Sequence, residues 1–453
     1  MTELSYFPAA TPFVATIATN PQGGAVQQAE GLLGAFPLAK LGISALESEL
    51  DSKGLDYQTD IEPLFGNPVA VGLLQVPGAA SLSGANYLVV WVTKSAARLD
   101  AFVKGLPGVT SAGTFDGAAL YRVGGDAIAA DGSTAVLAAS TASIDTALSR
   151  HAHSGGISAA DFSSAIGNLP QNTLVQAFGS LSGALSGPRA ATAREIPWLA
   201  AIRGYAASIS AGSAGLTVQF RIDTSGGALT SSELPISGGT SAPALAGTLP
   251  ITVGLRDPAQ SFDFILAALQ AVDPATYHEF VNGDNAAKRE TGYDLQTFAA
   301  LLTGNLIIQS DTRTTMGRAD VSDAASAAKQ LALLPRFVSA THAPHAVTRT
   351  SGGFYSIKES GGRSLNLGLV GSEVVAGLAT PAQLRAFAHA PTTPATTQGS
   401  LAFRISLLDL LRIVIKSAPN SIIQSVLSSL GDITGSATAG TGALTGSLSL
   451  GVK

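Results

Sequence analysis

One phrase occurs twice in this chain of 453 residues. The stretch GLDYQTDIEPLFGN runs from Gly54 to Asn67, and GYDLQTFAALLTGN runs from Gly292 to Asn305. Seven positions are identical, and every identical pair has the same separation in sequence as Gly54 and Gly292. This separation is far longer than the period of a solenoid repeat, so the phrase predicts a tandem pair of similar folding units.

The similarity extends to other segments. TPFVATIATNPQ corresponds to LPITVGLRDPAQ, where Pro12 and Pro250 have the same separation as the residues of the repeated phrase. STAVLAASTASIDTAL corresponds to SEVVAGLATPAQLRAF, where the separation of Val136 and Val375 is almost the same. Each segment reads as an apolar strand followed by a helix, with a Thr cap in the second pair. We therefore predict a duplicated unit with few insertions and a pseudo-two-fold axis between its copies.

The ends of the two halves are also similar. AGLTVQFRI resembles GALTGSLSLGV, but Leu216 and Leu444 are closer together in sequence than the earlier pairs, so the second half is shorter near its end. The stretch between the halves is rich in Gly, Ser and Pro, which favours a surface connection. We predict a first unit at residues 1–223, a linker at 224–247 and a second unit at 248–453.

Strands joined by Gly-rich turns alternate with short amphipathic helices, which predicts an α+β fold with a mainly antiparallel sheet and helices packed on one face. Within the repeated phrase, Thr59 and Glu62 are expected to form a capping box, and Gly66 is expected to end the helix. Residues that begin and end a helix in this way indicate that the phrase connects secondary-structure elements and has no direct role in function. The alternative is that Asp56 and Asp294 line a site.

Composition excludes several classes of function. The chain has 46% hydrophobic and 13% charged residues, a net charge of -5 and no Lys/Arg cluster, so nucleic acid is not an expected partner. It contains no cysteine, which rules out disulfides and thiolate metal sites. No apolar run is long enough to predict a membrane-spanning helix.

The chemistry-bearing residues do not form a recognisable catalytic motif. His151 and His153 follow a short helix, where the helix dipole favours a positive charge. His342 and His345 lie in a Pro-interrupted stretch expected to be a surface loop. An S-x-x-K match at Ser326 lacks the companion motifs of its enzyme class. We therefore predict no metal site, no cofactor and no catalytic residue.

The most suggestive segment is SLLDLLRIVIKSAPNSIIQSVLSSL, which begins at Ser406. Its apolar arc is wider than one packed helix face needs. The segment is expected to be a helix buried against the sheet; the alternative is the wall of an apolar ligand cavity. The corresponding segment of the first half, EIPWLAAIRGYAASI, is also apolar. The candidate ligand-binding residues of the two segments are Leu407, Leu411, Val414, Trp198 and Tyr205.

Several phrases of the first half occur in a known order: FPAATPFVATIATNPQ, LLGAFPLAKL, GLDYQTDIEPLFGNPVAVGLL and YLVVWVTKSAARLDAFVKGL. In these phrases the chain resembles the bacterial domain-of-unknown-function family 3352. It departs from the family at Phe65, where Trp-Leu is usual. The resemblance implies an N-terminal membrane anchor, expected to have been removed here, and an extracytoplasmic body associated with the cell envelope. It implies no reaction.

The sequence therefore favours a non-enzymatic, extracytoplasmic binding or scaffold protein. The candidate ligand is a lipid or another apolar molecule held in or between the two units, and the candidate partner is another envelope protein. Contact with a membrane is expected only through the removed anchor. Two alternatives stay open: an envelope hydrolase with a Ser/His/Asp site assembled by the fold, and a purely structural envelope protein. A hydrolase would need a cleft with clustered polar groups and shifted pKa values.

Overall fold

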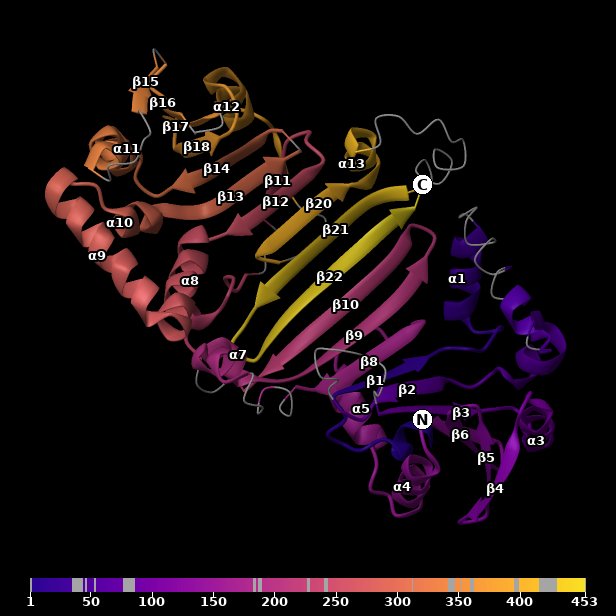
Figure 1. The fold of residues 1–453 in the computed structure, drawn as a ribbon. Coiled ribbons are helices and arrows are strands. Elements are labelled where there is room, and N and C mark those ends of the chain that lie inside the picture. The colour runs from indigo at the N-terminus through magenta and orange to yellow at the C-terminus, as the bar shows by residue number, and fades with distance from the viewer. Residues whose placement is uncertain are drawn as a thin grey trace.

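The structure is a computed structural model of the chain. It describes residues 2–34, 44, 47–52, 54–75, 86–181, 185, 190–225, 229–239, 243–311, 313–340, 347–350, 352–358, 362–394, 399–414 and 430–452. Most of the described strands belong to one antiparallel sheet of 20 strands. Helices gather toward the two ends of this sheet, as Figure 1 shows.

The first half of the chain contains ten strands of the large sheet, with helices between them. The elements are β1 (Phe13–Ile17), α1 (Gly24–Gly34), β2 (Val69–Leu73), β3 (Tyr87–Val92), α3 (Ala96–Gly105), β4 (Thr110–Phe115), β5 (Ala118–Val123), β6 (Asp126–Asp131), β7 (Thr134–Ala138), α4 (Thr141–Ala152), α5 (Ala159–Ile166), β8 (Val175–Ser180), α7 (Pro197–Ala201), β9 (Ile202–Gly212) and β10 (Gly215–Thr224). Short helical turns include η1 (Thr2–Tyr6), η2 (Tyr57–Ile61), η3 (Glu62–Leu64), η5 (Thr192–Glu195) and η6 (Ser231–Glu233).

The second half repeats this alternation. Its elements are β11 (Ala244–Ala246), β12 (Ile251–Arg256), α8 (Pro258–Val272), α9 (Pro274–Thr291), α10 (Leu295–Ala300), β13 (Leu302–Ser310), β14 (Thr315–Val321), α11 (Ala324–Ala340), β15 (Val347–Arg349), β16 (Tyr355–Lys358), β17 (Ser364–Val370), β18 (Glu373–Gly377), α12 (Pro381–Ala388), β19 (Thr392–Pro394), β20 (Leu401–Ser406), α13 (Leu407–Val414), β21 (Leu430–Ala439) and β22 (Ala443–Val452). β11 and β19 pair with each other as a separate two-stranded ribbon.

The pairing order is the same when it is followed from either end. It runs β4-β5-β6-β7-β3-β2-β1-β8-β9-β10 and continues β22-β21-β20-β12-β13-β14-β18-β17-β16-β15. The two halves therefore have equivalent strand connectivity. They meet where β10 pairs with β22, and Figure 1 shows these two long strands in the middle of the molecule.

The register at this junction is symmetric. Gln219 pairs with Ser447, and these two residues have the same separation in sequence as Leu216 and Leu444. A residue that precedes Gln219 in β10 therefore pairs with the β22 counterpart of the residue that follows Gln219 at the same distance. This is the local pattern of a pseudo-two-fold axis perpendicular to the sheet. A common origin of the halves stays a prediction, as does the division at residues 224–247.

One face of the sheet, here called the covered face, carries the main core of each half. In the first half, η1, α4 and α5 bury Val14, Val136 and Phe178 on this face. In the second half, α12 buries Met316 and Val375 on the same face. The predicted α+β fold with a mainly antiparallel sheet is confirmed.

The expectation that the helices pack on one face was wrong, as the two ends of the sheet show most clearly. There α3 packs on Ala135, the neighbour of Val136 in β7, and α11 packs on Val374, the neighbour of Val375 in β18. Adjacent residues of a strand point to opposite faces, so these two helices cover the other side. Sequence alone gives each helix an apolar stripe but does not say which face of the sheet receives it.

The contact between the halves yields a test. A Cβ atom added at Gly446 in β22 would lie 2.5 Å from the ring of Phe220 in β10 and 2.6 Å from the carbonyl oxygen of Ser436. We expect Gly446→Ala to lower the free energy of unfolding by about 1–3 kcal/mol through overpacking, measured by urea denaturation. Gly442→Ala, whose Cβ would meet no atom within 4 Å, is the control and should change the stability little.

Candidate functional site

The other face of the four central strands is almost entirely apolar, and we call it the apolar face. Residues that lie opposite each other in paired antiparallel strands point to the same side, so the register defines its members. In β10 and β22 they are Leu216, Val218, Phe220, Ile222, Leu444, Leu448 and Leu450. β9 adds Tyr205 and Ile209, and β21 adds Ile433.

The apolar face continues outward into both halves. On β2 and β3 it carries Val69, Val71, Leu73, Tyr87, Val89 and Trp91, and on β12 and β20 it carries Ile251, Val253, Leu255, Leu401, Phe403 and Ile405. These side chains are half-buried, whereas their strand neighbours on the covered face are mostly buried. Ile17, opposite Val69, and Ile308, opposite Val253, also belong to the apolar face. Together with Leu448 they are its more exposed members, with 38%, 36% and 38% of the surface of Ile17, Ile308 and Leu448 exposed.

At two places on the apolar face, a glycine leaves room for an aromatic ring of the neighbouring strand. The ring of Phe220 lies against Gly446, and the ring of Phe403 lies against Gly435. In both cases an aromatic side chain fills the space that a residue on the neighbouring strand leaves empty. The result is an apolar surface formed by side chains of several strands, without a deep hole.

The opposite side of the same four strands is polar. Hydroxyl groups meet across the strand pairs, with Thr217 Oγ1 3.1 Å from Ser449 Oγ and Ser436 Oγ 3.3 Å from Ser447 Oγ. Arg221 on this side forms an ion pair with Asp223. The middle of the sheet is therefore two-sided, with hydrocarbon on one face and hydroxyl groups on the other.

Helices and loops cover only part of the apolar face. At one end of the central strands, Trp198 of α7 and Phe264 of α8 pack with Ile222 and Leu444. No described helix packs closely against the middle of β10 or β22, and Figure 1 shows α1 and α8 on either side of the central strands. α8 also exposes the apolar side chains of Ile265 and Val272.

Two of the five predicted ligand-binding residues lie at the edge of this face. Trp198 is buried in the small core beside Ile222, and its indole N–H has no hydrogen-bond partner among the described residues. Tyr205 lies opposite Ile222 on β9. Its hydroxyl donates a hydrogen bond to the carbonyl of Pro12 at 3.0 Å, and burial raises its pKa.

The other three predicted residues belong to α13. Leu407 begins this helix and is half-buried. The side chains of Leu411 and Val414 lie outside the described part of the chain. The prediction missed the strand residues that form most of the apolar face. Their signal was the apolar residue at every second position in TVQFRI and TGSLSL, which predicts a two-sided strand.

The repeated phrase forms helix starts. Asp56, not Thr59, caps η2, because its carboxylate accepts a hydrogen bond from the Thr59 N–H at 2.8 Å. Asp294 likewise caps α10 and accepts from the Thr297 N–H at 2.8 Å. The expected capping box with Glu62 was therefore wrong. A carboxylate three residues before the N–H it accepts from has the geometry of a cap, and its charge also favours a helix N-terminus.

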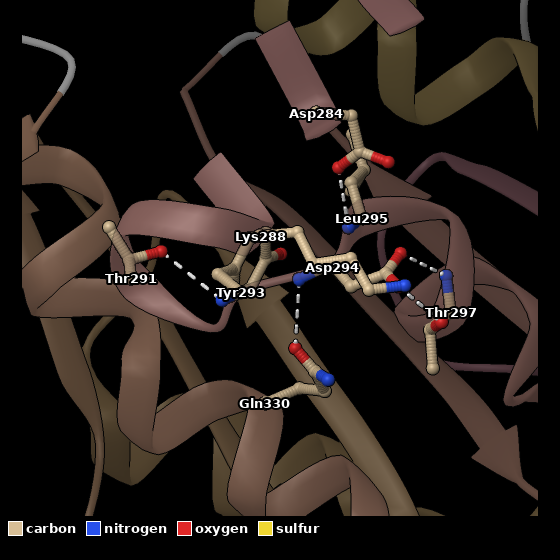
Figure 2. Close-up of polar contacts among 8 residues, drawn as sticks. All are labelled: Asp284, Lys288, Thr291, Tyr293, Asp294, Leu295, Thr297 and Gln330. Atoms are coloured by element: carbon tan, nitrogen blue, oxygen red, sulfur yellow. Dashed lines mark hydrogen bonds and ion pairs between the residues drawn. The ribbon is translucent and has the colours of Figure 1, made fainter. Parts of the chain in front are cut away.

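Around Asp294 the polar contacts form a network that ties three helices together (Figure 2). Lys288 of α9 approaches the Asp294 carboxylate at 2.7 Å, and Gln330 of α11 accepts the Asp294 N–H at 3.1 Å. Asp284 of α9 accepts the Leu295 N–H at 2.8 Å. Every polar group here has a structural partner, which favours a joint between helices.

The described histidines lie at or near helix ends and belong to no cluster of potential metal ligands within the described residues. His151 lies in the last turn of α4 and His153 caps its end, as the helix-end prediction expected, and His389 likewise caps the end of α12. His342 and His345 lie outside the described residues. No group of three or more potential metal ligands exists among the residues that the structure describes.

One Ser–His contact bears on the hydrolase alternative. Ser5 Oγ lies 2.5 Å from His151 Nδ1, and the His151 ring stacks on Tyr6. The Ser5 hydroxyl, however, donates its proton to the carbonyl of Thr2 at 2.6 Å. The Thr2 carbonyl and His151 Nδ1 therefore compete for the single Ser5 proton. This pair lacks the arrangement of an activated nucleophile.

Comparisons with known proteins do not identify a family or a function for this chain. No family model matches the chain, and no curated protein matches it. Among solved structures, crystal form III of TP0453 is 11% identical with a TM-score of 0.31, covering 50% of this chain and 82% of that chain. Crystal form I of TP0453 is 8% identical with a TM-score of 0.30, covering 50% and 81%. Likenesses this low carry no argument. In the described part of the chain, no helix is long and apolar enough to cross a membrane.

The burial of Trp198 predicts a role in stability. Removing a large, nearly buried aromatic side chain leaves a cavity, so Trp198→Ala should lower the free energy of unfolding by about 3–5 kcal/mol in urea denaturation. Ile265→Ala removes an exposed side chain from α8 and is the control, with little change expected. An unfolding free energy unchanged by Trp198→Ala would contradict the packing described here.

The Asp294 network predicts a pH dependence. Burial acts to raise the pKa of Asp294, but hydrogen bonds from Lys288 and Thr297 outweigh it and lower the pKa from 3.8 to about 2. The carboxylate therefore stabilises the fold above pH 4, and this contribution is lost as the pH falls toward 2. Asp294→Asn should destabilise by about 1–2 kcal/mol at pH 7, and the difference should shrink in acid.

Asp56→Asn provides the matched control for this experiment. Asp56 has the same capping role, but no lysine pairs with it among the described residues and it is exposed. Its substitution should destabilise the protein less than Asp294→Asn at pH 7, as measured by chemical denaturation over a pH series. Equal losses in the free energy of unfolding for the two substitutions would show that the Lys288 contact does not contribute to stability.

Proposed function

We propose that this protein is a non-enzymatic binding protein that holds a lipid or another long apolar molecule on the apolar face of its central sheet. The observation that carries the proposal is the continuity of this face. Apolar side chains extend from β3 through the central strands to β13, and they are half-buried or exposed. Contiguous apolar surfaces of this kind mark interaction sites in proteins.

The energetics of burial support an apolar ligand. Covering about 200 Å² of apolar surface contributes about 5 kcal/mol, before the cost of ordering the ligand. Leu448 and Ile308 belong to this face and still expose more than a third of their surface. A flexible hydrocarbon chain could cover such side chains along several strands, whereas a rigid small molecule would contact only a few.

The polar side of the central sheet supports the same proposal. The hydroxyl pairs Thr217–Ser449 and Ser436–Ser447 give this side water-compatible chemistry. The two faces thus differ sharply over one pair of strands. An antiparallel sheet usually packs its apolar face and leaves its polar face to water. No described helix packs closely against the middle of β10 or β22, so the apolar face there is available to a partner.

The hydrolase alternative has less support. Ser5 and His151 are close, but the Thr2 carbonyl competes with His151 for the serine proton. The envelope location belongs to the proposal as well, because it rests on the resemblance to the domain-of-unknown-function family 3352. A scaffold role for the same apolar face, with an envelope protein as partner, is the second candidate and is distinguished by the experiment below.

The test compares adjacent residues that point to opposite faces. Val218 and Leu448 pair on the apolar face, whereas Thr217 and Ser449 pair on the polar face. The purified protein would be mixed with vesicles carrying a fluorescent fatty-acyl probe, and transfer of the probe to the protein would be measured. We expect the double substitution Val218→Gln/Leu448→Gln to weaken transfer about tenfold or more, since it removes apolar contact area.

Thr217→Gln/Ser449→Gln is the matched control, because it alters the same strands on the other side. It should leave probe transfer unchanged while causing a similar change in stability. No transfer to the wild-type protein would refute lipid binding and favour the scaffold role. Equal losses in both double variants would show that the effect comes from the strands and not from the apolar face.

A further inference from the structure

The two halves differ in one connection. In the first half, residues 139–174 join β7 to β8, and they contain α4 and α5. In the second half, residues 378–400 join β18 to β20, and they contain α12 and the short β19. The second connection is the shorter one and has no counterpart of α5 among its described residues.

In the first half, α5 completes the core. Phe162 of α5 packs edge-on against Phe178 of β8, with ring centroids 5.6 Å apart. Phe178 lies opposite Val14 of β1, and both are buried. The covered face of β1 and β8 is therefore apolar and filled.

The corresponding positions in the second half are polar. Arg404 of β20 lies opposite Thr252 of β12, just as Phe178 lies opposite Val14. Val14 and Thr252 each lie two positions after the matched prolines Pro12 and Pro250, so they are equivalent in the two halves. An arginine and a threonine thus take the places of two core residues, on the face that α5 covers in the first half.

A cavity of about 290 Å³ lies at this place. Thr252 and Arg404 line it together with the β11–β19 ribbon and its flanks, which contribute Leu245, Ala246, Gly247, Thr248, Ala390, Pro391 and Thr393. No aspartate or glutamate is among these lining residues. The volume lies at the lower end of the range for small-molecule sites.

Two polar side chains of the cavity, those of Thr252 and Arg404, lack strong partners. Thr252 is 1% exposed, and its hydroxyl has no hydrogen-bond partner among the described residues. The Arg404 guanidinium donates one long hydrogen bond, of 3.5 Å, to the carbonyl of Gly247, and it forms no ion pair within the described chain. A buried hydroxyl without a partner is costly, and a half-buried guanidinium is stabilised by an anion.

We propose that this cavity is a binding site for a small organic carboxylate with a compact apolar body. The carboxylate would accept hydrogen bonds from the Arg404 guanidinium and the Thr252 hydroxyl. The apolar body would lie against Leu245, Ala390 and Pro391. A bare inorganic anion would leave these apolar walls uncovered, so the lining favours an organic acid.

The site is separate from the proposed lipid surface. Arg404 and Thr252 point to the covered face, whereas their strand neighbours Phe403 and Val253 belong to the apolar face. Compact ligands therefore distinguish the two sites better than long chains do. Benzoate is a suitable probe, and benzamide has the same shape without the charge.

The experiment is a titration of the full chain with benzoate, benzamide and inorganic phosphate, followed by saturation-transfer NMR and calorimetry. Benzoate should bind at one site, with benzamide and phosphate each at least about tenfold weaker, because each lacks one of the two interactions. Arg404→Gln should weaken benzoate binding about tenfold or more. Arg122→Gln, which removes an exposed arginine from β5, is the control and should not change it.

Thr252→Val gives a second, independent readout. It removes a buried hydroxyl that lacks a partner, so the melting temperature without ligand should stay the same or rise, while benzoate binding should weaken. Val218→Gln/Leu448→Gln should leave benzoate binding unchanged, which separates this site from the apolar face. Equal binding of benzoate and benzamide, or benzoate binding that survives both Arg404→Gln and Thr252→Val, would overturn the proposal.

Discussion

The pairing of β10 with β22 is the contact on which the architecture depends. Nine residues of each strand lie in register around Gln219 and Ser447, and this ladder makes one sheet from two halves. Backbone groups in these strands are satisfied by pairing alone, so no helix is needed to hold the middle together. Helices contact the central strands only away from the middle of β10 and β22, and these strands keep two faces of opposite chemistry.

This arrangement separates two kinds of surface. The apolar face is formed by strands and has no depth, which suits a flexible chain laid across it. The cavity around Arg404 is enclosed by the β11–β19 ribbon and suits a compact anion. The first arises from the symmetry of the halves, since both contribute to it equally. The second arises from their difference, since Phe178 occupies the corresponding place in the first half.

Substitution of core residues by polar ones follows a pattern in the second half. Arg318 takes the place on β14 that Val90 has on β3, and it is buried with its guanidinium donating to the carbonyls of Phe387, Ala388 and Ala390 at the end of α12. Those carbonyls lie at the negative end of the helix dipole and bind Arg318 Nη1 internally, although Arg318 Nε has no partner among the described residues. Arg404 has no comparable set of acceptors. The buried Arg318 thus has a structural role, whereas the half-buried Arg404 carries the binding site proposed above.

The sequence by itself determined the equivalence of the halves and the alternation of their strands, because spacing and side-chain period are local properties of a chain. It named Trp198 and Tyr205 as candidate ligand-binding residues, which the structure places at the edge of the apolar face, but it assigned the capping of the repeated phrase to Thr59 in place of Asp56. Only the tertiary structure decided which face of each strand is covered, because that depends on where helices distant in sequence pack. The partners of Arg404 and Arg318 follow from the same packing, which no local pattern encodes.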